Sequence, residues 1–591
     1  MRALVTLAVA LLLPSSAVAG QVRPDGQSPN PLHRLLAEHL EWRLREFPES
    51  ATRRGDSRYN ARLTDLSPDA MGRRKQATRR FLAQARAIDA STLAGQDLLT
   101  HALFVSTLER DIEGDRFPTE VLPVDQINGP QLAFDNLIEV TRFRTRADYD
   151  DYLARLAAVP RYFDQVTALL KRGIDIGWVQ PAGPLRGVPE QIEAQITSDP
   201  SKSLFYGPFN RFPTTIPETD REQLRAAGRA AIANGIVPAL TQFRDFVRDV
   251  YLPAGRTRPI GVSALPNGAD YYRYAIRQFT TTSLTADSIH RLGLAEVARI
   301  RVKMDSVMRR TGFSGSFAEF LSFLRTDPRF YYTKAEDLVA GYRDIAKRAD
   351  AGLPALFAEL PRNTYGVRAF PDFEGPSQTT ARYYRGASDG SRPGYYMVNT
   401  YRLDMRPKYE MEALTLHEAV PGHHLQVARA LELRELPDFR RNAPFTAFTE
   451  GWGLYAESLG EEMGFYTDPY SKFGQLTYEM WRACRLVVYT GMHRFGWSRQ
   501  RAIDFMKENT AKSEQDIVVE IDRYIVWPGQ ALAYKLGELK IKELRARAQR
   551  ELGNRFDIRK FHNAVLDNGP LPLDVLEREI DHWISAQKTR T

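Results

Sequence analysis

The sequence predicts a mainly α-helical protein, and three observations support this fold class. Apolar residues recur every three or four positions with charged residues between them, first at Leu32, Leu35, Leu36, Leu40 and Leu44. Similar helical stripes follow over residues 149–170, 221–250, 284–308, 477–489 and 532–544. No repeat with a fixed period of about 30 to 45 residues is visible, which argues against a solenoid. A chain of 591 residues with 43% hydrophobic residues can bury a large core.

The amino-terminal residues have the pattern of a secretory signal peptide. Met1 and Arg2 precede an apolar run from Ala3 to Leu13, and the small-residue pattern Ala17-Val18-Ala19 follows. A membrane helix needs about 20 apolar residues, and neither this run nor any later stretch reaches that length. We therefore predict a signal peptide over residues 1–19, a mature chain without a membrane span, and a periplasmic or secreted location.

Composition argues against several other classes of protein. The formal net charge is +8, from 81 basic and 73 acidic residues, and the basic residues form no stripe interleaved with aromatics, so nucleic-acid binding is not expected. Cys484 is the only cysteine, which excludes an internal disulfide. Loop-rich stretches occur at 117–131, 178–217 and 359–393, but none has the composition of a flexible linker. Residues 20–591 are therefore expected to form a single large domain.

One short segment differs from its helical surroundings. Tyr395 to Tyr401 is rich in aromatic and β-branched residues and follows Arg392-Pro393-Gly394, as expected for a short strand. It lies just upstream of a histidine-rich segment. We interpret it either as an edge strand that binds a substrate backbone or, equally, as a small structural hairpin.

The strongest functional signal is the octapeptide His417-Glu418-Ala419-Val420-Pro421-Gly422-His423-His424. In an H-E-x-x-H helix the two histidines lie one turn apart and bind one zinc, and the glutamate contacts its water. Here six or seven steps separate the histidines, which in an ideal helix is about 9 to 10.5 Å along the axis. Pro421 and Gly422 predict a break between them. The segment is a stretched zinc-peptidase motif or, alternatively, a polar helix end that happens to hold histidines.

A catalytic zinc needs a third protein ligand and one open position. Glu450 follows His423 by 27 residues, which accommodates a turn near Pro437 and a returning helix, so Glu450 is the best candidate. Glu457 lies seven residues further on and would face the same side of that helix. It either orients a ligand histidine or is a solvated helix charge, and we slightly favour the second interpretation.

Three separated motifs together resemble the bacterial family named domain of unknown function 885. They are the octapeptide, Thr449–Trp452 with Leu454–Glu457, and Asp522–Ile525 with Pro528–Lys535. The similarity extends over nearly the whole mature chain, including Asp389–Gly394 and Asn399-Thr400. That family resembles the gluzincin peptidases, whose metal site consists of two histidines and a downstream glutamate.

The resemblance implies a two-lobed helical zinc-peptidase-like fold with a deep central cleft and a small β edge element near the metal. It also implies one Zn²⁺ per chain, held by His417, His423 and Glu450. The gluzincin motif usually ends in Gly-His, which favours His423 over His424 as the second ligand. His424 is then a neighbour that contacts substrate or supports the ligands.

The expected chemistry follows from this ligand set. Zinc lowers the pKa of bound water from about 15.7 to about 7, and Glu418 is the expected general base. The candidates for stabilising the oxyanion are Tyr524, Tyr534 and His493, with Tyr524 the first choice by position; each is alternatively a packed or capping group.

Further side chains are candidates for contacts with substrate. Arg523 and Lys535 are expected to hold a substrate carboxylate, arginine the more specifically because its fork is bidentate, or else to make surface salt bridges. Asn399 is a further candidate for a contact with substrate or around the metal.

The sequence therefore predicts a secreted or periplasmic zinc metallopeptidase that acts on short or unfolded peptides. One alternative is a peptide-binding protein with the same fold and little turnover. Another is a zinc amidase that acts on non-peptide amides. The motifs are compatible with cleavage at either end or within a peptide, and with any oligomeric state.

Overall fold

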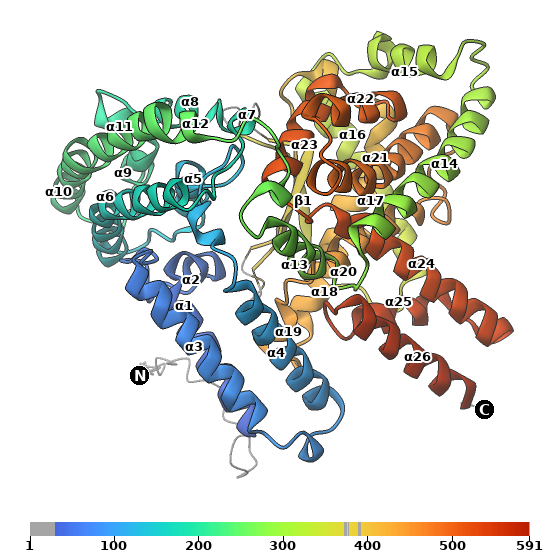
Figure 1. Cartoon of the computed structure of the whole chain (residues 1–591), viewed down its shortest axis with the longest axis horizontal. Coiled ribbons are helices and arrows are strands. Elements are labelled where there is room, and N and C mark those ends of the chain that lie inside the picture. The colour runs from blue at the N-terminus through green and yellow to red at the C-terminus, as the bar shows by residue number, and fades with distance from the viewer. Residues whose placement is uncertain (1–29, 372–374, 376–377, 388–389, 391, 590–591) are drawn as a thin grey trace, which may run out of the picture.

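The computed structural model describes residues 30–371, 375, 378–387, 390 and 392–589, so the predicted signal peptide lies outside the described residues. The fold is mainly α-helical with one small three-stranded mixed sheet, as the periodicity predicts (Figure 1). Among the described residues, none of the helices combines the length and the apolar character needed to cross a membrane.

The first half of the chain consists of helices and connecting loops. Its helices are α1 (Pro31–Glu46), α2 (Pro48–Arg54), α3 (Pro68–Arg86), α4 (Gly95–Gly114), α5 (Pro130–Val140), α6 (Arg146–Asp175), α7 (Ala182–Leu185), α8 (Val188–Glu193), α9 (Gly207–Asn210), α10 (Glu218–Ala231), α11 (Val237–Phe246), α12 (Leu252–Ala254) and α13 (Gly268–Thr280). The stripe predicted over residues 149–170 lies in α6, which begins at a capping box formed by Thr145 and Asp148.

The second half contains the sheet and the longer buried helices. Its elements are α14 (Ala286–Arg310), α15 (Phe317–Thr326), α16 (Ala335–Leu356), β1 (Tyr365–Ala369), β2 (Ala381–Tyr384), β3 (Gly394–Val398), α17 (Met411–Glu418), α18 (His423–Glu432), α19 (Asp438–Arg441), α20 (Thr446–Ser458), α21 (Pro469–His493), α22 (Arg499–Asn509), α23 (Glu514–Val526), α24 (Leu532–Leu552), α25 (Ile558–Leu566) and α26 (Leu573–Thr589). Helix α21 is buried along most of its length, so it forms the centre of this half.

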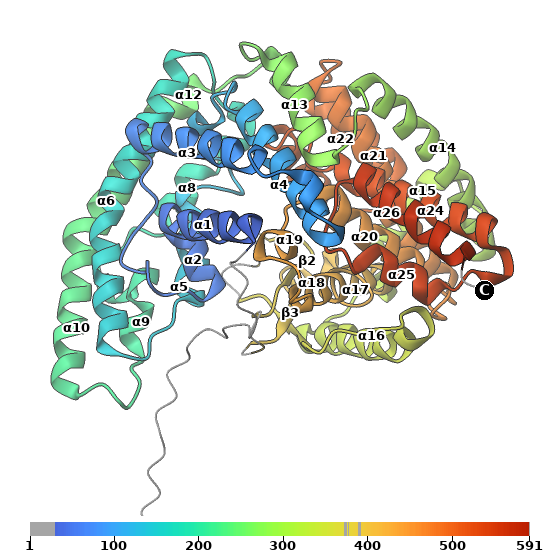
Figure 2. The same ribbon diagram turned by 90° about the horizontal axis from the view of Figure 1, so that it is seen from below.

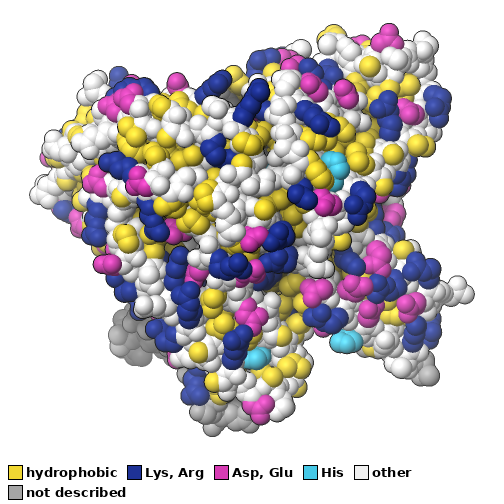
Figure 3. All heavy atoms as spheres, viewed as in Figure 1, with side chains coloured by type: hydrophobic (Ala, Val, Ile, Leu, Met, Phe, Trp, Pro, Cys, Tyr) yellow, Lys and Arg dark blue, Asp and Glu magenta, His cyan; other side chains and the backbone are white. Residues whose placement is uncertain are grey.

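Hydrophobic side chains gather in two large cores. One core is built from residues 124–251 and belongs to α5–α12, which lie together on one side of the molecule in both ribbon views (Figures 1 and 2). The larger core joins α13–α26 and the sheet on the other side. On the face drawn in Figure 3, basic and acidic side chains both occur across the surface.

The sheet corrects the sequence interpretation of the β segment. The predicted strand exists as β3, but β3 is the central strand: the order is β1-β3-β2, with β1 parallel and β2 antiparallel to it. The edge strand near the histidine segment is β2, within the stretch 359–393 that the sequence predicted to be loop. Its four residues stand in a Pro-, Gly-, Ser- and Thr-rich stretch, so the local pattern was too short to indicate a strand.

Helices α20 and α24 cross at unusually close range because two glycines meet there. A Cβ added at Gly451 would lie 2.5 Å from the Cα of Gly537, and one added at Gly537 would lie 1.9 Å from the carbonyl oxygen of Ala447. Real Cβ atoms do not approach backbone so closely, so both positions require glycine. This crossing fixes the turn of α20 that carries Glu450.

Candidate metal centre

The histidine segment is broken where the sequence predicts. Helix α17 ends at Glu418 and α18 begins at His423. A Cβ at Gly422 would lie 1.9 Å from the carbonyl oxygen of His417, so only glycine fits this close approach. The indole nitrogen of Trp452, on α20, donates a hydrogen bond of 2.8 Å to the carbonyl oxygen of Pro421. The loop is thereby tied to the helix that supplies the third candidate ligand.

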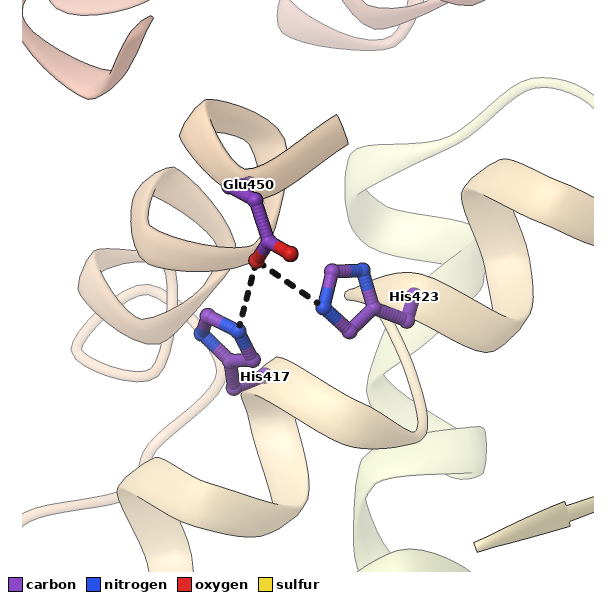
Figure 4. A group of neighbouring side chains, drawn as sticks. All are labelled: His417, His423 and Glu450. Carbon is purple, nitrogen blue, oxygen red and sulfur yellow. Dashed lines mark ion pairs between the residues drawn. The ribbon is translucent and has the colours of Figure 1, made fainter. Parts of the chain in front are cut away.

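His417, His423 and Glu450 converge on one point (Figure 4). The Oε2 atom of Glu450 lies 3.7 Å from Nε2 of His417 and 3.4 Å from Nε2 of His423, and the three ligand atoms lie within 4.8 Å of one another. Donors bound to zinc at about 2.1 Å in tetrahedral geometry are about 3.4 Å apart. The three residues therefore form a group that can hold a metal ion.

The carboxylate of Glu450 supports this interpretation. Its Oε2 atom is buried and accepts no hydrogen bond from the described residues, which is unfavourable for a carboxylate oxygen unless a cation approaches it. Burial would raise the pKa of Glu450, but His423 and His417 outweigh that effect and hold the pKa below its usual range. Burial would lower the pKa of His417, but Glu450 and Glu457 outweigh it and raise this pKa to about 9. The pocket thus attracts positive charge.

Glu457 lies beneath the metal group and is fully buried, which corrects our preference for a solvated helix charge. Its Oε1 accepts a hydrogen bond of 2.8 Å from Nδ1 of His417 and lies 3.4 Å from Nη2 of Arg482. Two turns along α20 from Glu450, it faces α17 and α21 rather than solvent. Its bond holds the proton of His417 on Nδ1, which leaves Nε2 free as a metal ligand.

Gly453 makes room for the His417 ring. A Cβ at this position of α20 would lie 2.8 Å from Cε1 and 2.9 Å from Nε2 of that imidazole. This role could not be predicted, because a glycine in a helical pattern does not reveal what packs against it.

Glu418 contacts the edge strand. Its Oε2 accepts a hydrogen bond of 2.9 Å from the backbone amide of Tyr383. The backbone amide of Asn399 donates a hydrogen bond of 3.0 Å to the backbone carbonyl oxygen of Thr380. This bond fixes which residues of β2 bond to β3 and which point away from it. The backbone groups of Ala381 and Tyr383 therefore point to the open edge of β2. Tyr383 was not among the sequence candidates, because the strand that carries it was not predicted.

Of the three candidates for oxyanion stabilisation, one lies against the metal group. The ring of Tyr534 is nearly parallel to that of His417, with an interplanar angle of 17° and 6.3 Å between centroids. Tyr524, the first choice from sequence, is fully buried, and its hydroxyl accepts hydrogen bonds from Trp481 (3.0 Å) and Arg485 (2.7 Å). The structure thus engages Tyr524 in internal packing.

His493 is also engaged within the core. Its Nδ1 accepts from the amide of Val262 at 3.1 Å, and its Nε2 donates to the carbonyl oxygen of Tyr524 at 2.9 Å. Burial lowers its pKa to about 4, so the ring is neutral. Neither nitrogen remains available to a reacting group.

His424 and Asn399 both support the sheet and its loops. His424 bonds the hydroxyl of Tyr383 through Nδ1 and the carbonyl oxygen of Asn363 through Nε2, each at 3.0 Å, so it offers no nitrogen to a metal. The amide nitrogen of Asn399 donates to the carbonyl oxygen of Gly375 at 2.9 Å, and its Oδ1 accepts from the amide of Tyr401 at 2.9 Å. Asn399 thereby ties the loop before β2 to the end of β3.

One of the two cationic candidates, Lys535, differs from the sequence expectation. Lys535 is fully buried and pairs with Glu538 (2.7 Å), Glu479 (2.9 Å) and Glu296 (3.0 Å), so it is not free for a substrate carboxylate. Its position on α24, facing α14 and α21, explains this correction.

Arg523 pairs with Glu520 at 2.9 Å and bonds Gln530 at 3.1 Å. Two other arginines close to the metal group, Arg482 and Arg485, were missed. Their only sequence signal is that two charges three residues apart interrupt the apolar stripe of α21.

The fold and this cluster define a helical protein with a potential divalent-metal centre. The chain belongs to the family of bacterial proteins of unknown function designated DUF885, whose pattern matches residues 48–580. A crystal structure of a "putative lipoprotein" from Colwellia psychrerythraea is similar, with a TM-score of 0.89, 29% identity, and coverage of 94% of this chain and 99% of that one.

A structure from Shewanella oneidensis, described in the same words and of unknown function, shares the fold, with a TM-score of 0.65 and 16% identity. The match covers 93% of this chain and 99% of the Shewanella oneidensis chain. A comparison with curated proteins finds no match.

Proposed function

We propose that this protein is a secreted or periplasmic zinc metallopeptidase that hydrolyses peptide bonds in short or unfolded peptides. The convergence of His417, His423 and Glu450 around a buried carboxylate oxygen that has no hydrogen-bond partner in the described part of the chain is the observation that carries the proposal. Two imidazoles and one carboxylate, with the fourth position left to water, are a ligand set typical of catalytic zinc. A gluzincin-like arrangement of two lobes around a deep cleft, within one domain over residues 20–591, belongs to the same proposal.

Zinc at this position supplies a Lewis acid and lowers the pKa of water to about 7. Glu418 then takes a proton from the attacking water at a carboxylate oxygen and later passes it to the leaving nitrogen. Tyr534, whose ring is stacked beside that of His417, is our first candidate for stabilising charge that develops on the carbonyl oxygen. Glu457 keeps the His417 ring oriented throughout.

The open edge of β2 supports binding of an extended peptide. The amide of Tyr383, which now donates to Glu418, points to that edge, so a substrate strand added there would run past the proposed general base. Backbone pairing gives affinity without selecting one side chain. This suits a peptidase for short or unfolded chains.

The proposed location rests on two observations. The amino-terminal sequence has the signal-peptide pattern, and the two structural relatives are each described as a "putative lipoprotein", which favours the cell envelope.

Digestion of a mixed peptide library, read by mass spectrometry, tests the proposal. Wild type should give products that a chelator abolishes and added zinc restores. Glu418→Gln should lower product formation about 10²- to 10⁴-fold while one zinc per chain stays bound. The matched control is Glu461→Gln, at an exposed acid that pairs with Lys472.

Equal product patterns from wild type and Glu418→Gln would remove the peptidase assignment. Zinc binding without any products would favour a peptide-binding protein. Hydrolysis of non-peptide amides alone would favour an amidase.

A further inference from the structure

Three buried guanidinium groups lie near the metal group, and they pair with fewer carboxylates than are needed to balance their charge. Arg482 and Arg485 come from α21 and Arg523 from α23, with side chains 6%, 4% and 12% exposed. Glu520 pairs with both Arg485 (2.8 Å) and Arg523 (2.9 Å), and Glu457 pairs with Arg482. Within the described part of the chain, the ion pairs of the three arginines reach these two acids. One positive charge is therefore not balanced, which is costly in a buried environment.

Two nitrogen atoms of this cluster lack a hydrogen-bond partner. Nη1 of Arg485 and Nε of Arg482 are buried and donate to no acceptor among the described residues. The other nitrogens of Arg485 are fixed, because Nε donates to Tyr524 at 2.7 Å and Nη2 to Glu520 at 2.8 Å. The guanidinium of Arg485 is thus held rigidly with one donor group unused. An unused buried donor beside an unbalanced charge indicates that an anion completes the cluster.

The cluster lies within a short distance of the metal group. The guanidinium carbon of Arg485 is 4.5 Å from the ring centroid of Tyr534, and that ring is 6.3 Å from the ring of His417. The separation between the guanidinium carbon of Arg485 and the ring centroid of His417 therefore cannot exceed the sum of these two distances. About three residues of extended peptide cover such a span, at about 3.4 Å per residue. Tyr534, whose ring the Arg485 guanidinium contacts, is half-buried and therefore partly exposed to solvent.

We propose that Arg485, assisted by Arg482, binds the α-carboxylate at the carboxyl end of the substrate. A carboxylate supplies the acceptors that the two unpartnered donors lack, one charge-assisted hydrogen bond from each arginine, and balances the excess charge. The enzyme then removes a fragment of one to three residues from the carboxyl end. This inference rests on the proposed peptidase function and extends it to the substrate class.

Calorimetric binding of uncut peptides tests the proposal. The zinc-loaded Glu418→Gln protein is titrated with one pentapeptide in three forms: the free acid, the C-terminal amide, and the amide with glutamate as its last residue. The acid should bind about 10- to 100-fold more tightly than either amide. Adding Arg485→Gln should weaken binding of the acid to the level of the amide and leave the amide unchanged.

Several results would overturn the proposal. Acid and amide could bind equally to the protein with Arg485 intact, or Arg485→Gln could weaken both peptides by the same factor. The glutamate-ended amide could bind as tightly as the acid, which would refute the assignment to the chain end. The comparison of acid with amide needs no substitution at Arg485, so it holds even where that variant fails to fold.

Two further variants serve as controls. Arg485→Lys keeps the charge but loses the rigid guanidinium that Tyr524 and Glu520 hold in place, so its discrimination between acid and amide should be intermediate. Arg499→Gln is the matched control, because Arg499 forms a two-bond pair with Asp522 outside the cluster and should leave both affinities unchanged.

Cleavage of the same peptides by wild type separates this inference from the proposed function. Discrimination in binding without any cleavage would refute the peptidase and retain the carboxylate site. Equal cleavage of acid and amide would retain the peptidase and refute the carboxylate site.

Discussion

Gly453→Ala tests whether the His417 ring must stand where α20 leaves room for it. The added Cβ would lie 2.8 Å from Cε1 of that ring. Carbon atoms pack at about 3.5 to 4.0 Å, so the ring must retreat by about 0.7 Å. Metal–ligand distances tolerate about 0.2 Å, so we expect zinc affinity to fall at least about tenfold, or about 1.4 kcal/mol.

The same substitution has a predictable effect on stability. Alanine gains about 0.5 to 1 kcal/mol over glycine in a helix, whereas overpacking costs about 1 to 3 kcal/mol. The free energy of unfolding should therefore fall by up to about 2.5 kcal/mol, measured by denaturant titration of the metal-free protein. The matched control is Gly72→Ala in α3, where an added Cβ meets nothing within 4 Å and should stabilise the protein.

Zinc affinity of Gly453→Ala is measured by competition with a chromophoric chelator. A variant that folds like wild type and binds zinc with wild-type affinity would refute the reasoning. Such a result would mean that His417 is not a ligand in the position described.

The remaining predictions concern the ligands, the helix crossing and pH. Glu450→Gln should lower zinc affinity more than 100-fold and Glu457→Gln about 10- to 100-fold, by chelator competition; unchanged affinity in either would contradict its role. Gly537→Ala should destabilise the protein by more than about 3 kcal/mol, because its Cβ would lie 1.9 Å from backbone; a near-neutral result in denaturant would contradict the crossing. In metal-free protein the folded-state pKa of His417, about 9, exceeds its ordinary 6.5. The stabilisation that protonated His417 adds to the free energy of unfolding is therefore full below pH 6.5 and lost as the pH rises through about 9. The loss should reach about 3 kcal/mol, and a flat unfolding free energy across that pH range would contradict it.

Local sequence patterns were sufficient to predict a mainly helical fold and the break in the histidine segment. Helical periodicity predicts a mainly α fold, because apolar spacing depends only on which face packs inward. Pro421 and Gly422 indicate the break because their backbone restrictions act locally. Glu450 was singled out from spacing and resemblance, and the structure brings it to the two histidines.

Features that depend on tertiary packing could not be predicted from the sequence. Glu457 is buried because α20 faces α17 and α21, and nothing in its neighbourhood along the chain indicates that burial. The carboxylates that surround Lys535 come from α14, α21 and α24, so its pairing is a property of three packed helices. Strand β2 exists because it pairs with β3, which a four-residue pattern does not reveal.

X-ray absorption at the zinc edge, on wild type loaded with one equivalent of zinc, tests the central claim most directly. We predict one zinc per chain, with two histidine nitrogens at about 2.0 to 2.1 Å and carboxylate and water oxygens at about 2.0 to 2.2 Å. A spectrum without histidine ligands, or the absence of stoichiometric zinc binding, would contradict the proposed centre.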